Sequence, residues 1–231
     1  MPHTKKARTG LLASLLLIFF LLPVWADDKA KDEETLGNAA TVLQSMLDAK
    51  SVPASVLAKA DCVIVLPSVK KGAFIVGGTG GRGPMICRGG KNFSGRWSAP
   101  AMYSIGGASV GMQVGGTATD FVLLIMSGQA VDKMLEGKTK IGSDMTAAAG
   151  PGATSTGSVG GADILTYGKA SGLFAGMSLS GSSLSPDDDA NQRLYGTASA
   201  RDIVVGGKVK TTAGGQRLVS LLNTKVPKHS D

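Results

Sequence analysis

A serine set between glycines is the first feature of this sequence with the residue types of a catalytic site. Gly107, Ser109 and Gly111 match the G-x-S-x-G nucleophile elbow of hydrolases. That elbow needs a strand–turn–helix context and a histidine that accepts the serine proton. The chain has only two histidines, His3 and His229, which lie near its two ends, and the residues after Gly111 continue in a strand-like pattern. The motif therefore predicts a strand rather than a hydrolase site.

Two further motifs have the residue types of phosphate-binding loops. Residues 78–83 match G-x-G-x-x-G after a strand-like run, but Pro84 and another strand-like run follow them. A dinucleotide site would need a helix there, because the helix N-terminus holds the pyrophosphate. Residues 137–139 match the end of a P-loop, but Asp132 replaces the glycine that the motif requires. We expect a glycine-rich turn at residues 78–83 and no nucleotide cofactor.

Metal-binding patterns are equally incomplete. Asp187, Asp189 and Asn191 have the spacing that opens a calcium loop, but Gln192 replaces the glycine and Ala198 the glutamate of that loop. Two cysteines without a histidine in the core also exclude a structural zinc site. We therefore expect an exposed turn, no metal, no cofactor and no enzyme activity.

The two cysteines of the chain, Cys62 and Cys87, could form a disulfide in an exported protein. Closing a loop of this length contributes roughly 3 kcal/mol when the geometry is unstrained. Both residues flank apolar runs, however, where a free cysteine is often simply buried. The sequence leaves both alternatives open.

Basic residues are concentrated in one part of the chain. No Asp or Glu occurs between Cys62 and Thr119. The basic residues of this region are Lys70, Lys71, Arg82, Arg88, Lys91 and Arg96. Such a cluster predicts a positive surface for an anionic partner, with Trp97 at the interface. The alternatives are six separately solvated side chains and a buried Trp97. Nucleic acid is excluded as a partner by predicted export and by the low aromatic content of 5%.

Residues 1–26 have the pattern of an export signal. Three basic residues precede an apolar block, and Val24, Trp25 and Ala26 offer a small-residue cleavage site. Removal of this leader would lower the formal net charge from +7 to +4. We expect a periplasmic or secreted protein in which residues 27–35 are a linker, residues 36–223 one domain and residues 224–231 a basic tail.

Periodicity predicts the elements of this domain. Apolar residues recur at helical spacing over residues 32–49, and further helices are expected at 53–59, 128–135, 197–205 and 213–223. Period-two alternation over 106–116 has one apolar face and one face of glycine and small polar residues, and an apolar run follows at 121–126. We expect these two segments to form a hairpin, and residues 164–167 and 173–179 to form a second one. The fold class is α+β, a single β-rich domain of antiparallel, glycine-rich strands with peripheral N- and C-terminal helices.

The order of several short motifs resembles the SYLF domain family. These motifs are Lys70-Lys71-Gly72-Ala73-Phe74, Trp97-Ser98-Ala99-Pro100, Ser109-x-Gly111-x-Gln113-x-Gly115, Asp120 before its apolar run, Ala149-Gly150-Pro151-Gly152, Tyr167, Gly172-Leu173-Phe174-Ala175-Gly176, Asn191 and Tyr195-Gly196. The resemblance covers about residues 36–223. Within the family, the chain is similar to the exported bacterial members.

The resemblance implies a lipid-binding module without catalysis, since eukaryotic relatives bind phosphoinositide membranes and some act on actin. Our first hypothesis is an envelope module that binds anionic phospholipid through Lys70, Lys71, Arg82, Arg88, Lys91, Arg96 and Trp97. The alternative is a structural or protein-interaction module, in which the glycine-rich face packs on a partner protein or on a second copy. An acyl-chain carrier is a third hypothesis. The sequence does not determine the oligomeric state.

Overall fold

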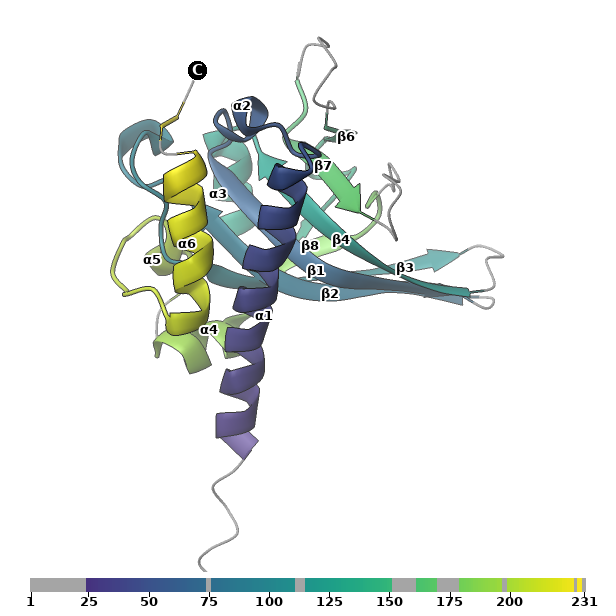
Figure 1. Ribbon diagram of the computed structural model, residues 1–231. Coiled ribbons are helices and arrows are strands. Elements are labelled where there is room, and N and C mark those ends of the chain that lie inside the picture. The colour runs from purple at the N-terminus through teal and green to yellow at the C-terminus, as the bar shows by residue number, and fades with distance from the viewer. Residues whose placement is uncertain are drawn as a thin grey trace, which may run out of the picture.

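One curled sheet with helices on both faces organises the computed structural model (Figure 1). The structure describes residues 24–73, 76–110, 115–150, 161–169, 179–196, 199–226 and 228–229. The strands of these residues are β1 Cys62–Ala73, β2 Val76–Cys87, β3 Ala101–Val110, β4 Gly115–Ile125, β5 Thr139–Lys140, β6 Ala147–Ala149, β7 Ile164–Lys169 and β8 Ser183–Pro186. Their order across the sheet is β5-β8-β3-β2-β1-β4-β7-β6, and every pairing except β6 with β7 is antiparallel.

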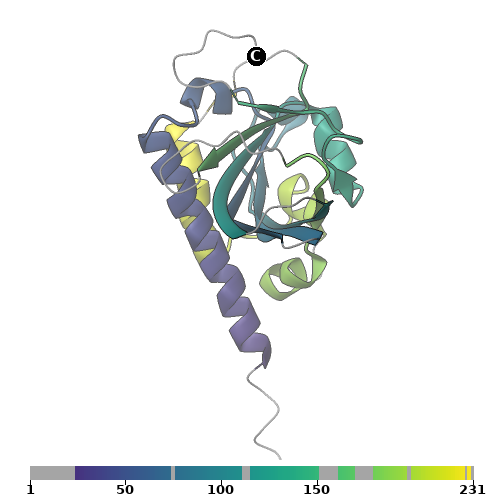
Figure 2. The ribbon, with the colours of Figure 1, turned by 90° about the vertical axis from the view of Figure 1, so that its right-hand side faces the viewer.

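Two apolar cores lie on the two faces of this sheet. The helices are α1 Val24–Asp48, α2 Ala54–Leu57, α3 Gly128–Leu135, α4 Asp188–Tyr195, α5 Ala200–Val204 and α6 Ala213–Lys225, with a short 3-10 turn at Lys91–Phe93. Helices α1, α2 and α6 contribute to the core on one face, whereas α3 and α5 contribute to the core on the other. Figure 2 shows the curl of the sheet, with α1 along one side of the molecule and α3 on the opposite side. The predicted α+β class is confirmed.

Strand β1 is central because it is apolar on both faces. Its residues 62–66 are all fully buried, since even positions pack into one core and odd positions into the other. Pro67 and Ser68 then interrupt the ladder, and the pairing register shifts between Leu66 and Val69. Ser68 has a positive φ of 50°, and its amide donates to an Asp120 carboxylate oxygen at 2.9 Å. This bulge turns Lys70 toward the face that carries α1.

The N-terminal helix is longer than periodicity predicted. Helix α1 begins at Val24 and includes residues 27–35, so the expectation of a linker there is wrong. The physical reason is that Asp32 is fully buried and Glu33 partly buried, and both make tertiary contacts that hold the first turns of α1 in place. Most of the predicted leader, residues 1–23, lies outside the described residues. None of the described helices is both long enough and apolar enough to cross a membrane.

Two strand predictions also need correction. The expected glycine turn at residues 78–83 lies inside β2, where all of these residues pair with β3 and residues 78–80 pair with β1 as well. The expected hairpin between residues 106–116 and 121–126 is absent, because β3 and β4 lie on opposite sides of the β1–β2 pair. Strand β1, apolar on both faces, takes β4 as its second neighbour. Residues 173–178 of the second predicted hairpin lie outside the described residues.

Helix positions were predicted more closely. Helix α3 runs over Gly128–Leu135 as expected, because Ser127 caps it by accepting a hydrogen bond from the Ala130 amide. Asp187 caps α4 in the same way, so the expected exposed turn at 187–191 is the start of a helix. Helix α6 reaches Lys225, which places the first residues of the predicted basic tail in a helix.

Candidate functional site

The outer halves of β1–β4 present an exposed face of small residues. These strands project beyond α1 and α6 in Figure 1. Cross-strand pairs share a face of the sheet, so the register places seven exposed residues together on the side of α1. They are Lys70, Gly72, Gly78, Gly80, Gly106, Ala108 and Ala118. We call this surface the glycine platform.

Open space lies above the glycine platform. A Cβ atom added to Gly72, Gly80 or Gly106 would meet no heavy atom of the described residues within 4 Å. On the opposite face of β2 the glycines have another role, because a Cβ on Gly83 would lie 2.0 Å from the Val65 carbonyl oxygen. Close approach of another part of the backbone therefore explains why residue 83 is a glycine, but it does not explain the glycines of the platform.

A polar hollow of about 430 Å³ borders the platform where α1 crosses the sheet. Its lining residues are Thr35 and Asn38 from α1, Pro67, Ser68 and Lys70 from β1, and Gly80, Gly81 and Arg82 from β2. The β1 bulge opens this hollow because it displaces the chain at Pro67 and Ser68. The site thus combines a surface of small residues with a recess that contains hydroxyl, amide and basic groups.

Arg82 in the wall of this hollow belongs to an ion-pair network. Its Nη2 atom donates to Asp32 Oδ1 at 2.6 Å and lies 2.9 Å from Asp187 Oδ2. The Nε atom of Arg193 donates to the other oxygen of Asp32 at 2.8 Å. Two carboxylates and two guanidinium groups meet here, so the charge of Arg82 is balanced within the protein. The network joins α1, β2 and α4.

The predicted basic residues do not form one surface. Lys70 is exposed on the platform, but Lys71 lies on the opposite face of β1, 6.0 Å from the centre of the Phe121 ring. Burial lowers the pKa of Lys71. Lys91 and Arg96 are exposed beyond the other end of β2. At about 3.3 Å per residue, they lie about 25 Å from Lys70 along the strands.

Arg88 and Trp97 are part of the protein interior. Only 1% of Arg88 and 4% of Trp97 is exposed, and the guanidinium carbon lies 4.3 Å from the centre of the indole ring. Trp97 Nε1 donates to the Val226 carbonyl oxygen at 3.0 Å. Burial lowers the pKa of Arg88, and the charge of Asp61 opposes this shift. Neither side chain is placed to contact a membrane surface, because other parts of the chain cover both.

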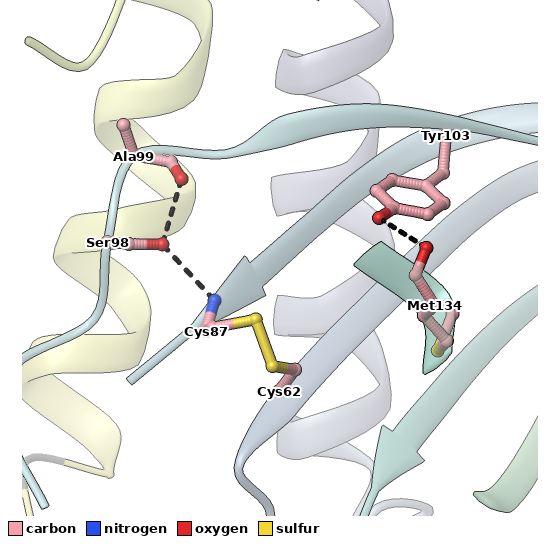
Figure 3. The surroundings of a disulfide bond; sticks show 6 residues. All are labelled: Cys62, Cys87, Ser98, Ala99, Tyr103 and Met134. Carbon is pink, nitrogen blue, oxygen red and sulfur yellow. Dashed lines mark hydrogen bonds between the residues drawn. A yellow bond between two sulfur atoms is a disulfide. The ribbon is translucent and has the colours of Figure 1, made fainter. Parts of the chain in front are cut away.

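Cys62 and Cys87 are joined by a disulfide in the structure (Figure 3). They face each other at the ends of β1 and β2, and both are fully buried. The Cys87 amide donates to Ser98 Oγ at 3.2 Å, and this hydroxyl donates to the Ala99 carbonyl at 2.9 Å. The bridge therefore also connects to the segment that leads into β3.

The catalytic patterns of the sequence have no catalytic context in the described residues. Ser109 lies within β3 rather than at a strand–turn–helix junction. No group of three or more His, Cys, Asp or Glu side chains is placed to bind a metal in the part of the chain that the structure describes. Asn191 from the calcium-like pattern is buried, where its amide oxygen accepts from the Met102 amide at 2.7 Å and its nitrogen donates to the Met102 carbonyl at 3.1 Å.

Sequence reasoning missed the contacts of α1 at this site. Asp32 precedes Leu36 by four positions and therefore lies on the buried stripe of the helix. A carboxylate on an apolar stripe was the available signal for a buried ion pair. Thr35 and Asn38 gave no such signal, because polar residues on the outer side of a helix are ordinary. Only the position of the β1 bulge brings them to a hollow.

Comparison with known proteins relates this chain to a family. The family model described as "Ysc84: Las17-binding protein actin regulator" matches residues 106–225. An SH3 domain-containing protein of Schizosaccharomyces pombe is 33% identical over 202 residues, which are 81% of this chain and 46% of that protein. Protein YSC84 of Saccharomyces cerevisiae is 31% identical over 201 residues, 81% of this chain and 42% of that protein.

A similar mammalian protein is the SH3 domain-containing YSC84-like protein 1 of Rattus norvegicus. It is 34% identical over 185 residues, which are 78% of this chain and 53% of that protein. The chain thus spans about half the length of the curated relatives that it matches. The family match extends from β3 through α6 and so includes part of the glycine platform. This chain belongs to the Ysc84 family, the SYLF-domain family that its motifs indicate.

Proposed function

We propose that this chain is a non-catalytic binding module that receives a protein partner on its glycine platform. The observation that carries the proposal is the open space above a four-stranded face of small residues. Without side chains in the way, the backbone of a partner segment can approach the sheet closely. Lys70 and the polar hollow at the border of the platform provide contacts that fix the orientation of that segment.

The names of the relatives support a protein as the partner. The family description includes Las17 binding, and one yeast relative is named LAS seventeen-binding protein 3. Those names describe the relatives, of which the matched region makes up 42% and 39%. For this chain we propose only the class of partner, a protein or a second copy of the chain.

Anionic phospholipid is the second candidate partner. The exposed side chains of Lys70, Lys91 and Arg96 favour it, since each basic residue near an anionic surface contributes about 1 kcal/mol. Two observations weigh against a membrane surface. The exposed basic residues lie at opposite ends of the β1–β2 pair, and Val205 is the only large apolar side chain that is exposed among the described residues. Insertion into a bilayer normally uses such side chains.

Export of the protein is part of the same proposal. Residues 1–26 carry the leader pattern, and a disulfide is typical of periplasmic and secreted proteins. We therefore propose a partner in the cell envelope or outside the cell.

Site-specific photocrosslinking tests the proposed partner class. A photoreactive amino acid at Ala108 on the platform should give a protein adduct in cells, and the same group at the exposed Ala148 of β6 should not. The change Gly106→Val should abolish the adduct, because a Cβ at this position meets no other atom within 4 Å and the added side chain occupies the space above the platform. Adducts of equal yield at both positions, or lipid adducts alone, would refute the proposal.

Vesicle flotation tests the second candidate. Binding to phosphatidylglycerol vesicles that is lost on Lys70→Glu, but unchanged by Gly106→Val, would favour phospholipid over protein. Equal recovery with neutral and anionic vesicles would exclude an electrostatic lipid contact.

A further inference from the structure

The residues that follow α6 are held against the end of the β1–β2 pair. We call Val226, Lys228 and His229 the C-terminal strap. Arg88 Nη2 donates to the carbonyl oxygens of Val226 at 3.0 Å and of Lys228 at 2.9 Å. Trp97 Nε1 donates to the same Val226 oxygen at 3.0 Å. The predicted basic tail is thus bound in its first part, through its backbone rather than through its charges.

The donors that hold the strap are rigidly placed. Arg88 and Trp97 are stacked and almost fully buried, so neither group is free to follow a strap that moves. Burial raises the pKa of Asp61, and the nearby His229 and Arg88 oppose this shift. The strap, Arg88 and Asp61 therefore form one contiguous cluster. Bonds to a charged donor are stronger than neutral ones, which makes Arg88 the main anchor.

The Cys62–Cys87 disulfide is covalently adjacent to this cluster. Asp61 directly precedes Cys62, and Arg88 directly follows Cys87. Past the disulfide, the Arg88 amide donates to the Asp61 carbonyl at 2.9 Å, and Arg88 forms an isolated bridge with Trp97. At this end the Asp61 amide also donates to the Ile125 carbonyl at 2.9 Å, and the Ser98 amide donates to the Cys87 carbonyl at 2.8 Å. The disulfide adds a covalent link between β1 and β2 at the position from which Arg88 reaches the strap.

We propose that the Cys62–Cys87 disulfide and the C-terminal strap form a redox-sensitive latch, in which reduction of the disulfide releases the strap from Arg88 and Trp97. The latch lies at the opposite end of β1 and β2 from the glycine platform and does not depend on the function proposed for that platform. Its release uncovers a guanidinium and an indole donor, and it frees the end of α6.

The step requires a dithiol reductant. One thiolate of the reductant attacks a cysteine sulfur, the S–S bond breaks, and a mixed disulfide forms while the other cysteine leaves as a thiolate. The second thiol of the reductant then closes its own disulfide and releases the second cysteine. The protein gains two electrons and two protons, and the dithiol is oxidised to a cyclic disulfide. Both sulfur atoms are buried, so the attack needs a local opening of the strand ends.

Hydrogen exchange measured by mass spectrometry on the full chain tests whether reduction of the disulfide releases the strap. After reduction with dithiothreitol and alkylation, peptides that cover residues 219–231 should exchange about tenfold faster, because their hydrogen-bonded anchor is lost. Peptides of α4, whose buried residues Ala190 and Leu194 pack outside the core that contains the disulfide, should keep their exchange rate. The change Arg88→Met should accelerate strap exchange with the disulfide intact, whereas Lys91→Met, an exposed residue of the same connection, should not.

The effect of the strap on the disulfide provides a second test, which leaves the core residues unchanged. Coupling between two sites is reciprocal, so loss of the strap must ease opening of the disulfide. A chain that ends at residue 227 lacks the Lys228 carbonyl, and its disulfide should be reduced about tenfold faster by dithiothreitol, as followed by thiol alkylation. An unchanged reduction rate in this chain, or unchanged strap exchange in the reduced full chain, would overturn the proposal. This holds even if Arg88→Met fails to fold.

Discussion

Replacement of Asp32 by asparagine should destabilise the fold through a residue that looks like part of a flexible N-terminal segment. Asp32 is fully buried, and its two carboxylate oxygens accept from Arg82 at 2.6 Å and from Arg193 at 2.8 Å. The asparagine side chain keeps the shape of the residue but removes its charge and one acceptor oxygen. Both arginines then face a neutral group.

The size of this loss follows from the exposure of the partners. A hydrogen bond to a charged group contributes about 1.5 to 3 kcal/mol, and two such bonds are weakened here. The Arg82 side chain is 37% exposed and keeps its contact with Asp187, so solvent and this second carboxylate compensate part of the loss. We expect a decrease of about 2 kcal/mol in the free energy of unfolding. For a domain of this size, that lowers Tm by about 4 to 8 °C.

Urea unfolding of the wild type and Asp32→Asn, followed by circular dichroism, measures this difference. Lys31→Gln is the matched control, because Lys31 is the neighbouring residue and its ion pairs with Asp27 and Asp28 are exposed. It should change stability by less than about 0.5 kcal/mol. The Asp32 effect should persist at high salt, since buried pairs are weakly screened. A loss below about 0.5 kcal/mol for Asp32→Asn would refute the anchoring role of the network.

Two further predictions concern glycine and pH. Gly83→Ala should destabilise the fold severely, because its Cβ would lie 2.0 Å from the Val65 carbonyl oxygen. Gly80→Ala should be nearly neutral, because open space surrounds that Cβ. Thermal unfolding compares the two variants directly, and equal Tm values would contradict this prediction. Burial raises the pKa of Asp61 above 3.8 in the folded protein. The folded state therefore binds more protons at Asp61 than the unfolded state does just above pH 3.8, so the contribution of Asp61 to stability falls as pH rises through that window. In urea titrations, the stability of Asp61→Asn should therefore fall less, or rise more, with pH than that of the wild type. An identical pH dependence in Asp61→Asn and the wild type would exclude this contribution.

Local pattern predicted the elements better than it predicted their neighbours. Helix α3 has its expected bounds because its cap and its apolar stripe are both encoded within ten residues. Strands β3 and β4 were recognised from alternation and from an apolar run, but they were wrongly paired with each other. Alternation specifies which face of a strand is buried. It does not specify which strand lies beside it, because any strand with a matching face satisfies the same requirement.

The same limit applies to the candidate site residues, whose types were visible in the sequence but whose surroundings were not. A basic cluster in the sequence became an exposed Lys70, an ion-paired Arg82 and a buried Arg88, because burial depends on what packs above each side chain. Tertiary contacts of this kind join residues that are far apart in the chain. The Glu33 carboxylate, for example, accepts from the Thr212 hydroxyl at 3.0 Å.

The sequence alone determined the family, the α+β class and the presence of a glycine-rich strand face, since these depend on the order of short motifs and on periodicity. Only the tertiary structure decided that the glycines of β2 serve two purposes, close packing at Gly83 and an open platform at Gly80. The bulge at Pro67 and Ser68 reverses the faces of β1, and a sequence pattern does not reveal the partner strand against which such a shift occurs. For the same reason the strap, the disulfide and Arg88 became one cluster only when the chain end packed against the sheet.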